Sequence, residues 1–322
     1  MRSRALGDGV QALQAWFGGR GFDRHRHDTY AIGLTDSGVQ AFDYRGVAEM
    51  SLPGQVVVLH PDETHDGRAG TRDGFGYRIV YVAPARIEEA ARAIRGRPTP
   101  LPFVKQPVTV NAALAAAITG ALRLEPEPLA TDALVLALTE ALLDADPSCA
   151  AGARPPRLDP GAVARARHFL DAATDHVVRS EELEAVTGLT RFELARQFRT
   201  AFGTSPYRYS LLRRLDGVRA RLGAGAAPAQ IALGAGFADQ AHMSRHFKAA
   251  FGLAPARYQR LEARLATATT SSVGSTGLGM CMLYPAESVR RRSSTRPYAV
   301  SAIAGMRASA GSSSPRTRRI NV

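Results

Sequence analysis

Apolar residues recur every three or four positions along residues 180–262, and the same pattern occurs twice. Residues 188–209 run parallel to residues 236–258, and from Leu194 onward the matched positions are 49 apart. Before the turn the offset is 48, so the second turn is one residue longer. A period of this kind indicates one supersecondary unit that is built twice. The matched positions are Leu183 with Ile231, Gly188 with Gly236, Leu194 with Met243, Phe198 with Phe247, Phe202 with Phe251, Gly203 with Gly252, Pro206 with Pro255 and Tyr209 with Tyr258.

Each unit predicts two short helices joined by a tight turn. In the first unit, Ser180 is a favourable N-cap and Gly188 ends the first helix. Thr190 then caps the second helix, and Gly203 can take the left-handed position after it. Asp239 is the corresponding cap in the second unit. Two short helices joined by a glycine-containing turn form a helix-turn-helix motif.

A single long helix is predicted between the two units. Residues 205–222 carry an apolar stripe at helical spacing, made of Leu211, Leu215, Val218 and Leu222. From Pro206 to Leu222 the helix would span about 25 Å, at a rise of about 1.5 Å per residue. A spacer of that length could hold two reading helices roughly 34 Å apart, which is one turn of DNA. The two units are therefore predicted to read two successive major grooves.

The exposed face of the second helix in each unit offers side chains that can read DNA. Arginine can bond two acceptors on a guanine edge, and phenylalanine or alanine can contact a thymine methyl group. Hydroxyl and basic groups around that face suit phosphate contacts, which give affinity that depends on salt. The alternative is that Arg196 and Arg245 are ordinary surface charges. The predicted base-reading residues are Arg191, Phe192, Ala195 and Arg196, then Gln240, Ala241, His242 and Arg245; the predicted phosphate contacts are Thr190, Arg199, Ser244 and Lys248.

The front of the chain shows a different pattern. Short runs within residues 20–82 alternate between apolar and polar positions and are separated by Gly, Pro and Asp, which predicts a small β-sandwich or barrel. Two apolar helical stretches follow, at Ala112–Leu124 and Leu129–Leu143. The predicted fold class is therefore α+β. The predicted boundaries are 1–105 for a sensor domain, 106–150 for a helical pair that packs on it or dimerises, 151–160 for a linker, 161–265 for a DNA-binding domain, and 266–322 for a tail without a fold.

Charge and composition support this division. Residues 1–156 carry 16 basic and 18 acidic residues, whereas residues 157–265 carry 17 and 10. A near-neutral front joined to a basic back indicates a sensor joined to a binder of polyanions. The sequence has two cysteines and no apolar run long enough to cross a membrane. We therefore expect a cytoplasmic protein without a disulfide framework or membrane contact.

The repeated unit resembles the C-terminal DNA-binding domain of the AraC/XylS family of bacterial transcription regulators. The most specific match is IALGAGFADQAHMSRHFKAAFGLAPARYQR, residues 231–260. By the family pattern, the base-facing positions are Phe192, Ala195 and Arg196 in the first unit and Ala241, His242 and Arg245 in the second. One position departs from the pattern, because Glu184 stands where the family has a small alanine, as at Ala232 of the second unit. We expect this side chain to extend its carboxylate toward solvent or to leave it partly unsatisfied, so that Glu184→Ala raises the melting temperature.

The front region is similar to the cupin-like sensor domain of AraC-type regulators, which implies a jelly-roll barrel. On a strand, His25 and His27 face the same way, and a histidine from a neighbouring strand can join them around a metal. PGQVVVLHPDETH, residues 53–65, resembles the second cupin motif and ends at His65. The glutamate of the first cupin motif is absent, so we expect no metal and no cofactor. The predicted effector-binding residues are His25, His27, Tyr30, His65 and Tyr77; the tyrosines equally suit a barrel core.

These patterns predict a sequence-specific DNA-binding transcription factor, controlled by a small-molecule effector bound in the cupin-like domain. The expected partners are double-stranded DNA and that effector, with RNA polymerase and a second copy of the chain as further candidates. The effector would change how the front half packs on the DNA-binding half. The alternative is a metal-dependent cupin enzyme with an accessory nucleic-acid-binding domain, in which His25, His27 and His65 hold the metal.

Overall fold

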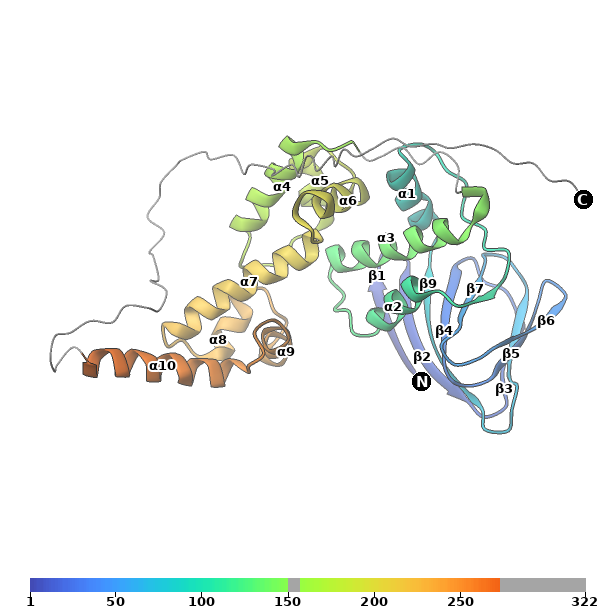
Figure 1. The fold of residues 1–322 in the computed structure, drawn as a ribbon, viewed down its shortest axis with the longest axis horizontal. Coiled ribbons are helices and arrows are strands. Elements are labelled where there is room, and N and C mark those ends of the chain that lie inside the picture. The colour runs from blue at the N-terminus through green and yellow to red at the C-terminus, as the bar shows by residue number, and fades with distance from the viewer. Residues whose placement is uncertain (150–156, 273–322) are drawn as a thin grey trace, which may run out of the picture. The chain divides into compact units, whose positions relative to one another are not determined.

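Two antiparallel sheets form the first part of the chain, in a computed structural model that describes residues 1–149 and 157–272 (Figure 1). The larger sheet has the strand order β1-β2-β9-β4-β7-β10, and the smaller one has the order β3-β8-β5-β6. Their strands are β1 (Arg2–Gly7), β2 (Val10–Phe17), β3 (Arg20–His25), β4 (Tyr30–Gly38), β5 (Gln40–Tyr44), β6 (Val47–Ser51), β7 (Val56–Leu59), β8 (His65–Ala69), β9 (Phe75–Val82) and β10 (Val108–Thr109).

The larger sheet is buried on both faces because its side chains alternate between two cores. Along β7, Val57 and Leu59 pack in the core that lies against the smaller sheet, together with Phe42 and Tyr44 of β5. Val56 and Val58 point the other way, into a core shared with helices. This double burial explains why β7 reads as the unbroken apolar run VVVL.

Three helices of the N-terminal region, residues 1–149, cover the outer face of the larger sheet (Figure 1). They are α1 (Pro84–Arg95), α2 (Ala112–Ala121) and α3 (Pro128–Ala145), and a short 3-10 turn follows at Pro147–Cys149. Pro84 and Pro128 lie in the first turns of α1 and α3, where a missing backbone N–H costs nothing. The side chain of Asn111 caps α2 by accepting a hydrogen bond from the Leu114 amide.

Seven helices form the C-terminal region, counted within residues 157–272. They are α4 (Pro160–Ala172), α5 (Ser180–Thr187), α6 (Arg191–Phe202), α7 (Pro206–Gly223), α8 (Pro228–Leu233), α9 (Gln240–Phe251) and α10 (Pro255–Ser272). Leu194 and Phe198 of α6 pack against α4 and α5 in one core. Met243 and Phe247 of α9 pack in a second core against the predicted stripe of α7. The long helix α7 thus joins two helix-turn-helix units, as predicted (Figure 1).

The α+β class is confirmed, with a sheet-rich front followed by helices. The strand prediction began too late, because β1 and β2 precede residue 20, and helix α1 was not predicted. The proposed tail from residue 266 also begins too early, since α10 continues to Ser272. The rest of that tail, and most of the predicted linker, lie outside the described residues. The described residues belong to a single compact unit of the chain.

Candidate DNA-reading and effector-binding sites

The two reading helices, α6 and α9, are built by the local signals that the sequence predicted. Thr190 caps α6: its hydroxyl oxygen accepts from the Glu193 amide, while the Glu193 carboxylate accepts from the Thr190 amide. Asp239 caps α9 by accepting from the His242 amide at 2.6 Å. Gly203 and Gly252 end the two helices in the left-handed conformation, with φ of 70° and 75°.

The cap of α5 differs from the prediction. Its N-cap is Arg179, whose amide donates to the Glu182 carboxylate at 2.7 Å, and Ser180 is the first helical residue. The Ser180 hydroxyl instead donates to Asp132 of α3. Asp132 is buried and also accepts from Arg86 of α1, and burial raises its carboxyl pKa. The hydroxyl expected to cap α5 therefore ties the first unit to the N-terminal region.

The predicted base-reading face of α6 is covered. Phe192 and Ala195 are 0% and 5% exposed and belong to the core formed by α1, α3 and the larger sheet. The guanidinium of Arg196 donates to the backbone carbonyls of Ala93 and Ile94 at the end of α1. In this conformation these three side chains are held by the N-terminal region and do not face a groove.

The charged residues of the first unit are also held in place. Arg191 donates to Glu181 at 2.8 Å and to Glu184 at 3.1 Å, and it lies 3.4 Å from Asp8 of the β1–β2 turn. Arg199, predicted to contact phosphate, donates to Glu140 of α3. Thr190, another predicted phosphate contact, is occupied as the cap of α6.

Glu184 does not behave as the sequence led us to expect. Its carboxylate accepts from the backbone amide of Arg191 at 2.8 Å and from the guanidinium of the same residue. The acidic side chain therefore helps to satisfy the first turn of α6, where backbone amides lack helical partners. The expectation of an unsatisfied carboxylate is wrong.

The second reading helix is more open. Gln240 and Ala241 are exposed at its start, and the side chain of Arg245 is 63% exposed. Lys248 is exposed and Ser244 is half-buried. His242 departs from the prediction, because it is 6% exposed and its ring packs 5.3 Å from the ring of Phe237. Within α9, Gln240, Ala241 and Arg245 therefore remain as accessible base-reading candidates.

Three predicted effector residues meet at one end of the two sheets. We call His25, His27 and His65 the histidine cluster. Strand pairing places His25 opposite His65, and their rings lie 4.5 Å apart. The His27 ring lies 4.9 Å from that of His65. Ligand-type atoms of all three residues lie within 4.8 Å of one another, so the structure brings together what the sequence placed 40 residues apart.

Hydrogen bonds orient all three rings in the same manner. The Nδ1 atoms of His25, His27 and His65 bond the backbone carbonyls of Asp23, Thr29 and Glu63 at 2.8–2.9 Å. Each Nδ1 therefore carries the proton, and each Nε2 keeps a lone pair. The Nε2 of His27 is buried and has no hydrogen-bond partner within residues 1–149 and 157–272. Burial lowers the pKa of His27, and lowers that of His65 to about 4. Three imidazoles oriented in this way can hold a divalent metal or a polar ligand group.

The two predicted tyrosines lie on opposite faces of the larger sheet. Tyr77 packs between the sheets, and its buried hydroxyl has no partner in the described part of the chain. Tyr81, which was not predicted, packs its ring 5.4 Å from that of His27. Tyr30 faces the helices instead, and its hydroxyl donates to the Pro102 carbonyl at 2.9 Å. Tyr30 therefore does not join the histidine cluster.

Comparison with known protein families agrees with this arrangement. Residues 10–142 match the model of the AraC-like ligand binding domain, and residues 183–261 match that of a helix-turn-helix domain. The chain carries both domains of an AraC-type transcriptional regulator. It binds DNA through the helix-turn-helix domain and a small-molecule effector through the N-terminal domain.

Individual relatives are distant. An uncharacterized HTH-type transcriptional regulator of Bacillus subtilis, YbfI, is 28% identical over 232 residues, which cover 69% of this chain and 81% of the relative. ToxT from Vibrio cholerae, in its apo form, is 13% identical, with a TM-score of 0.36 over 80% of this chain and 98% of ToxT. A probable AraC family regulator from Rhodopseudomonas palustris is 25% identical, with a TM-score of 0.30 over 31% of this chain and 96% of that protein.

One buried residue that the sequence analysis missed links the regulator's halves. Arg214 of α7 is 1% exposed and pairs with Glu127 just before α3 at 3.1 Å. It also donates to the Ala235 and Gly236 carbonyls in the turn of the second unit, and it lies over the Phe237 ring. The sequence could have indicated its burial, because Arg214 lies between Leu211 and Leu215 on the apolar stripe of α7.

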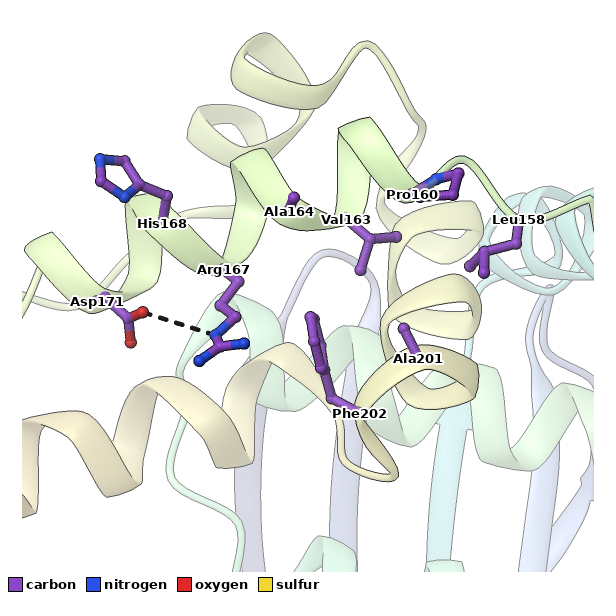
Figure 2. A pocket seen from close by; sticks show the side chains of 9 residues that line it. All are labelled: Leu158, Pro160, Val163, Ala164, Arg167, His168, Asp171, Ala201 and Phe202. Carbon is purple, nitrogen blue, oxygen red and sulfur yellow. Dashed lines mark ion pairs between the residues drawn. The ribbon is translucent and has the colours of Figure 1, made fainter. Parts of the chain in front are cut away.

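The regulator also has a groove beside α4 and the end of α6, with a volume of about 530 Å³. Figure 2 shows its lining, in which Arg167 pairs with Asp171 at 3.8 Å. The Arg167 guanidinium also lies 5.4 Å from the centre of the Phe202 ring. This groove contains none of the predicted reading or effector residues, so we assign it no role. No helix among the described residues combines the length and apolarity that a bilayer crossing requires.

Proposed function

We propose that this regulator reads two successive major grooves with α6 and α9, and that its effector controls whether α6 is available. The observation that carries this proposal is the burial of Phe192 and Ala195 in the core of the N-terminal region. A helix cannot occupy that core and a DNA groove at once. A ligand that favours the undocked state therefore raises the population that can bind with both units.

Base reading is assigned to exposed side chains of α9 and to docked side chains of α6. Gln240, Ala241 and Arg245 read one groove. Once α6 is free, Arg191, Phe192, Ala195 and Arg196 read the other. Lys248, Ser244, Arg199 and Thr190 hold the phosphate backbone. Support comes from the basic charge of the C-terminal region and from the matched positions in the two units.

The effector site is assigned to the histidine cluster and to Tyr77, which packs between the sheets. The partner-free Nε2 of His27 and hydroxyl of Tyr77 are buried polar groups, and burying such groups without a hydrogen bond is unfavourable. An effector that bonds them removes that cost. The regulator then acts by binding and not by catalysis. It works in the cytoplasm, as a dimer on DNA and in contact with RNA polymerase.

The first test concerns α9. A binding site is selected from a random DNA pool with the full-length protein, and affinity is measured for Arg245→Ala and Lys248→Ala. Removing Arg245 should cost about 1–3 kcal/mol on the selected site and relax one base position. Removing Lys248 should weaken all DNA alike. An unchanged preferred sequence in the Arg245 variant would contradict the assignment of α9.

A metal-dependent reaction at the histidine cluster is a second candidate function, favoured by the shared orientation of its three rings. Metal analysis of the purified protein, followed by an activity screen, distinguishes the enzyme from the regulator. Stoichiometric metal with turnover that is lost in a His27→Gln variant supports an enzyme. Sequence-specific DNA binding that persists after metal removal, with no turnover in the metal-loaded protein, supports the regulator alone.

A further inference from the structure

A second group of possible metal ligands lies on the second reading helix. His242 and His246 are four residues apart on α9, so both rings project from the same side of the helix. Their ring centres are 4.8 Å apart. Glu125, in the segment between α2 and α3, meets them, and ligand-type atoms of all three residues lie within 4.8 Å of one another. We call these three residues the α9 cluster.

The surroundings indicate a place for a ligand. His242 is 6% exposed, and its Nε2 is buried without a hydrogen-bond partner among the residues described. Phe237 packs against both histidine rings and closes one side.

We propose that Glu125, His242 and His246 bind a divalent transition-metal ion, such as Zn²⁺, and that the bound ion holds the α2–α3 segment on the reading face of α9. Two neutral imidazoles and one carboxylate are a common zinc ligand set. Around zinc, such ligand atoms lie about 3.4 Å apart, given bonds of about 2.1 Å in a tetrahedron. Rotation of the Glu125 and His246 side chains closes the remaining gap.

Two existing interactions change when the ion binds. The Nδ1 of His242 accepts from the Ala238 amide at 3.2 Å, so the ring proton is on Nε2 and must move to Nδ1, which gives up that long hydrogen bond. Glu125 pairs with Arg4 at 2.9 Å and with Arg245 at 3.4 Å, and the ion competes with both. Glu125 thus already touches a predicted base-reading residue, and the ion fixes its carboxylate beside the start of α9.

The consequence for DNA binding rests on the proposed reading role of α9. When the α2–α3 segment is held on this face, it keeps α9 out of the DNA major groove by steric overlap, and the acidic Glu125 repels phosphates. Metal-loaded protein should therefore bind the selected DNA site less tightly than metal-free protein. The metal site itself does not depend on that role, so binding of the ion and its effect on DNA can be measured separately.

The test uses the tag-free full chain with His25→Gln and His27→Gln, which disables the histidine cluster. Zn²⁺ binding is measured by calorimetry for this parent and for three variants made from it. Two variants remove a proposed ligand, His246→Gln and Glu125→Gln. The third, His168→Gln, is a control that changes an exposed histidine of α4. We expect the parent to bind one Zn²⁺ per chain. The affinity for Zn²⁺ should be about tenfold or more weaker in the two ligand variants and unchanged in the control. Thermal melting without metal checks that each variant is folded.

DNA affinity is then measured in EDTA and in Zn²⁺. We expect Zn²⁺ to weaken DNA binding of the parent by about tenfold and to leave the His246→Gln variant unchanged. Equal zinc affinity in the parent and in His246→Gln would overturn the site. Zinc binding with no change in DNA affinity would overturn the claim that the ion holds the α2–α3 segment on the reading face of α9. If the original protein, with its histidine cluster intact, binds no DNA even in EDTA, the proposed DNA-reading function is contradicted, whatever the calorimetry shows.

Discussion

The two reading helices come from one repeated sequence unit but occupy different environments. Helix α6 presents its reading face to α1 and α3, where Phe192 is fully buried. Helix α9 leaves Gln240 and Ala241 exposed, and Arg245 lies 3.4 Å from Glu125. Ala241 is the position that matches Phe192 at the offset of 49. A large apolar side chain on the reading face thus accompanies docking on the N-terminal region, and a small one accompanies exposure.

The comparison shows that a motif fixes a helix and its cap, while the neighbouring residues fix what that helix touches. Glu184 and Arg191 form a pair in the first unit, whereas Ala232 and Gln240 stand at the matching positions of the second. The first unit therefore carries its own acidic partner for the start of the reading helix. In the second unit, Asp239 caps the start of α9, and Arg245 pairs with Glu125 of the α2–α3 segment.

The largest expected effect tests the docking of α6. Phe192→Ala should lower the free energy of unfolding by about 3–5 kcal/mol, since it empties a fully buried site between α6 and the N-terminal region. The matched control is Ala241→Ser on α9, which is exposed and should change stability by less than about 0.5 kcal/mol. Denaturant unfolding measures both. Equal, small changes in the two variants would show that α6 is not docked in solution.

A smaller effect tests the acidic partner of α6. Glu184→Ala should lower the melting temperature, with a loss of about 1–3 kcal/mol, because the Arg191 amide and guanidinium lose their acceptor. Glu181→Ala, which removes a 61% exposed partner of the same arginine, should cost less than about 1 kcal/mol. A rise in melting temperature for Glu184→Ala would restore the expectation drawn from the sequence.

The smallest expected effect is on the pH dependence of stability, to which α9 can contribute through its histidines and α6, which has none, cannot. Burial lowers the pKa of His246 in the folded state below its usual value near 6.5. The neutral ring is favoured on folding, so this contribution to stability is present above about pH 6.5 and is lost as pH falls below it. His246→Gln should therefore reduce the loss of stability between pH 7 and pH 5. Parallel pH profiles for the variant and the original protein would contradict this.

Local signals made much of this fold predictable. The stripe of Leu194 and Phe198 and the caps at Thr190 and Asp239 specify α6 and α9 from residues close in sequence. The strand prediction covered the apolar run VVVL of β7 but missed β1 and β2, which precede residue 20. The partnership of His25, His27 and His65 was predictable only in part, since it depends on the pairing of β3 with β8.

By itself, the sequence determined the repeat, the helix caps, the basic C-terminal region and the class of regulator, because these depend on residue type and short spacing. Tertiary structure decided which predicted residues are accessible. It buried Phe192 and His242, turned Tyr30 to the other face of its sheet, and gave Glu184 a partner. The physical reason is that exposure and hydrogen bonding depend on which elements pack together, and elements far apart in sequence supply most of those neighbours.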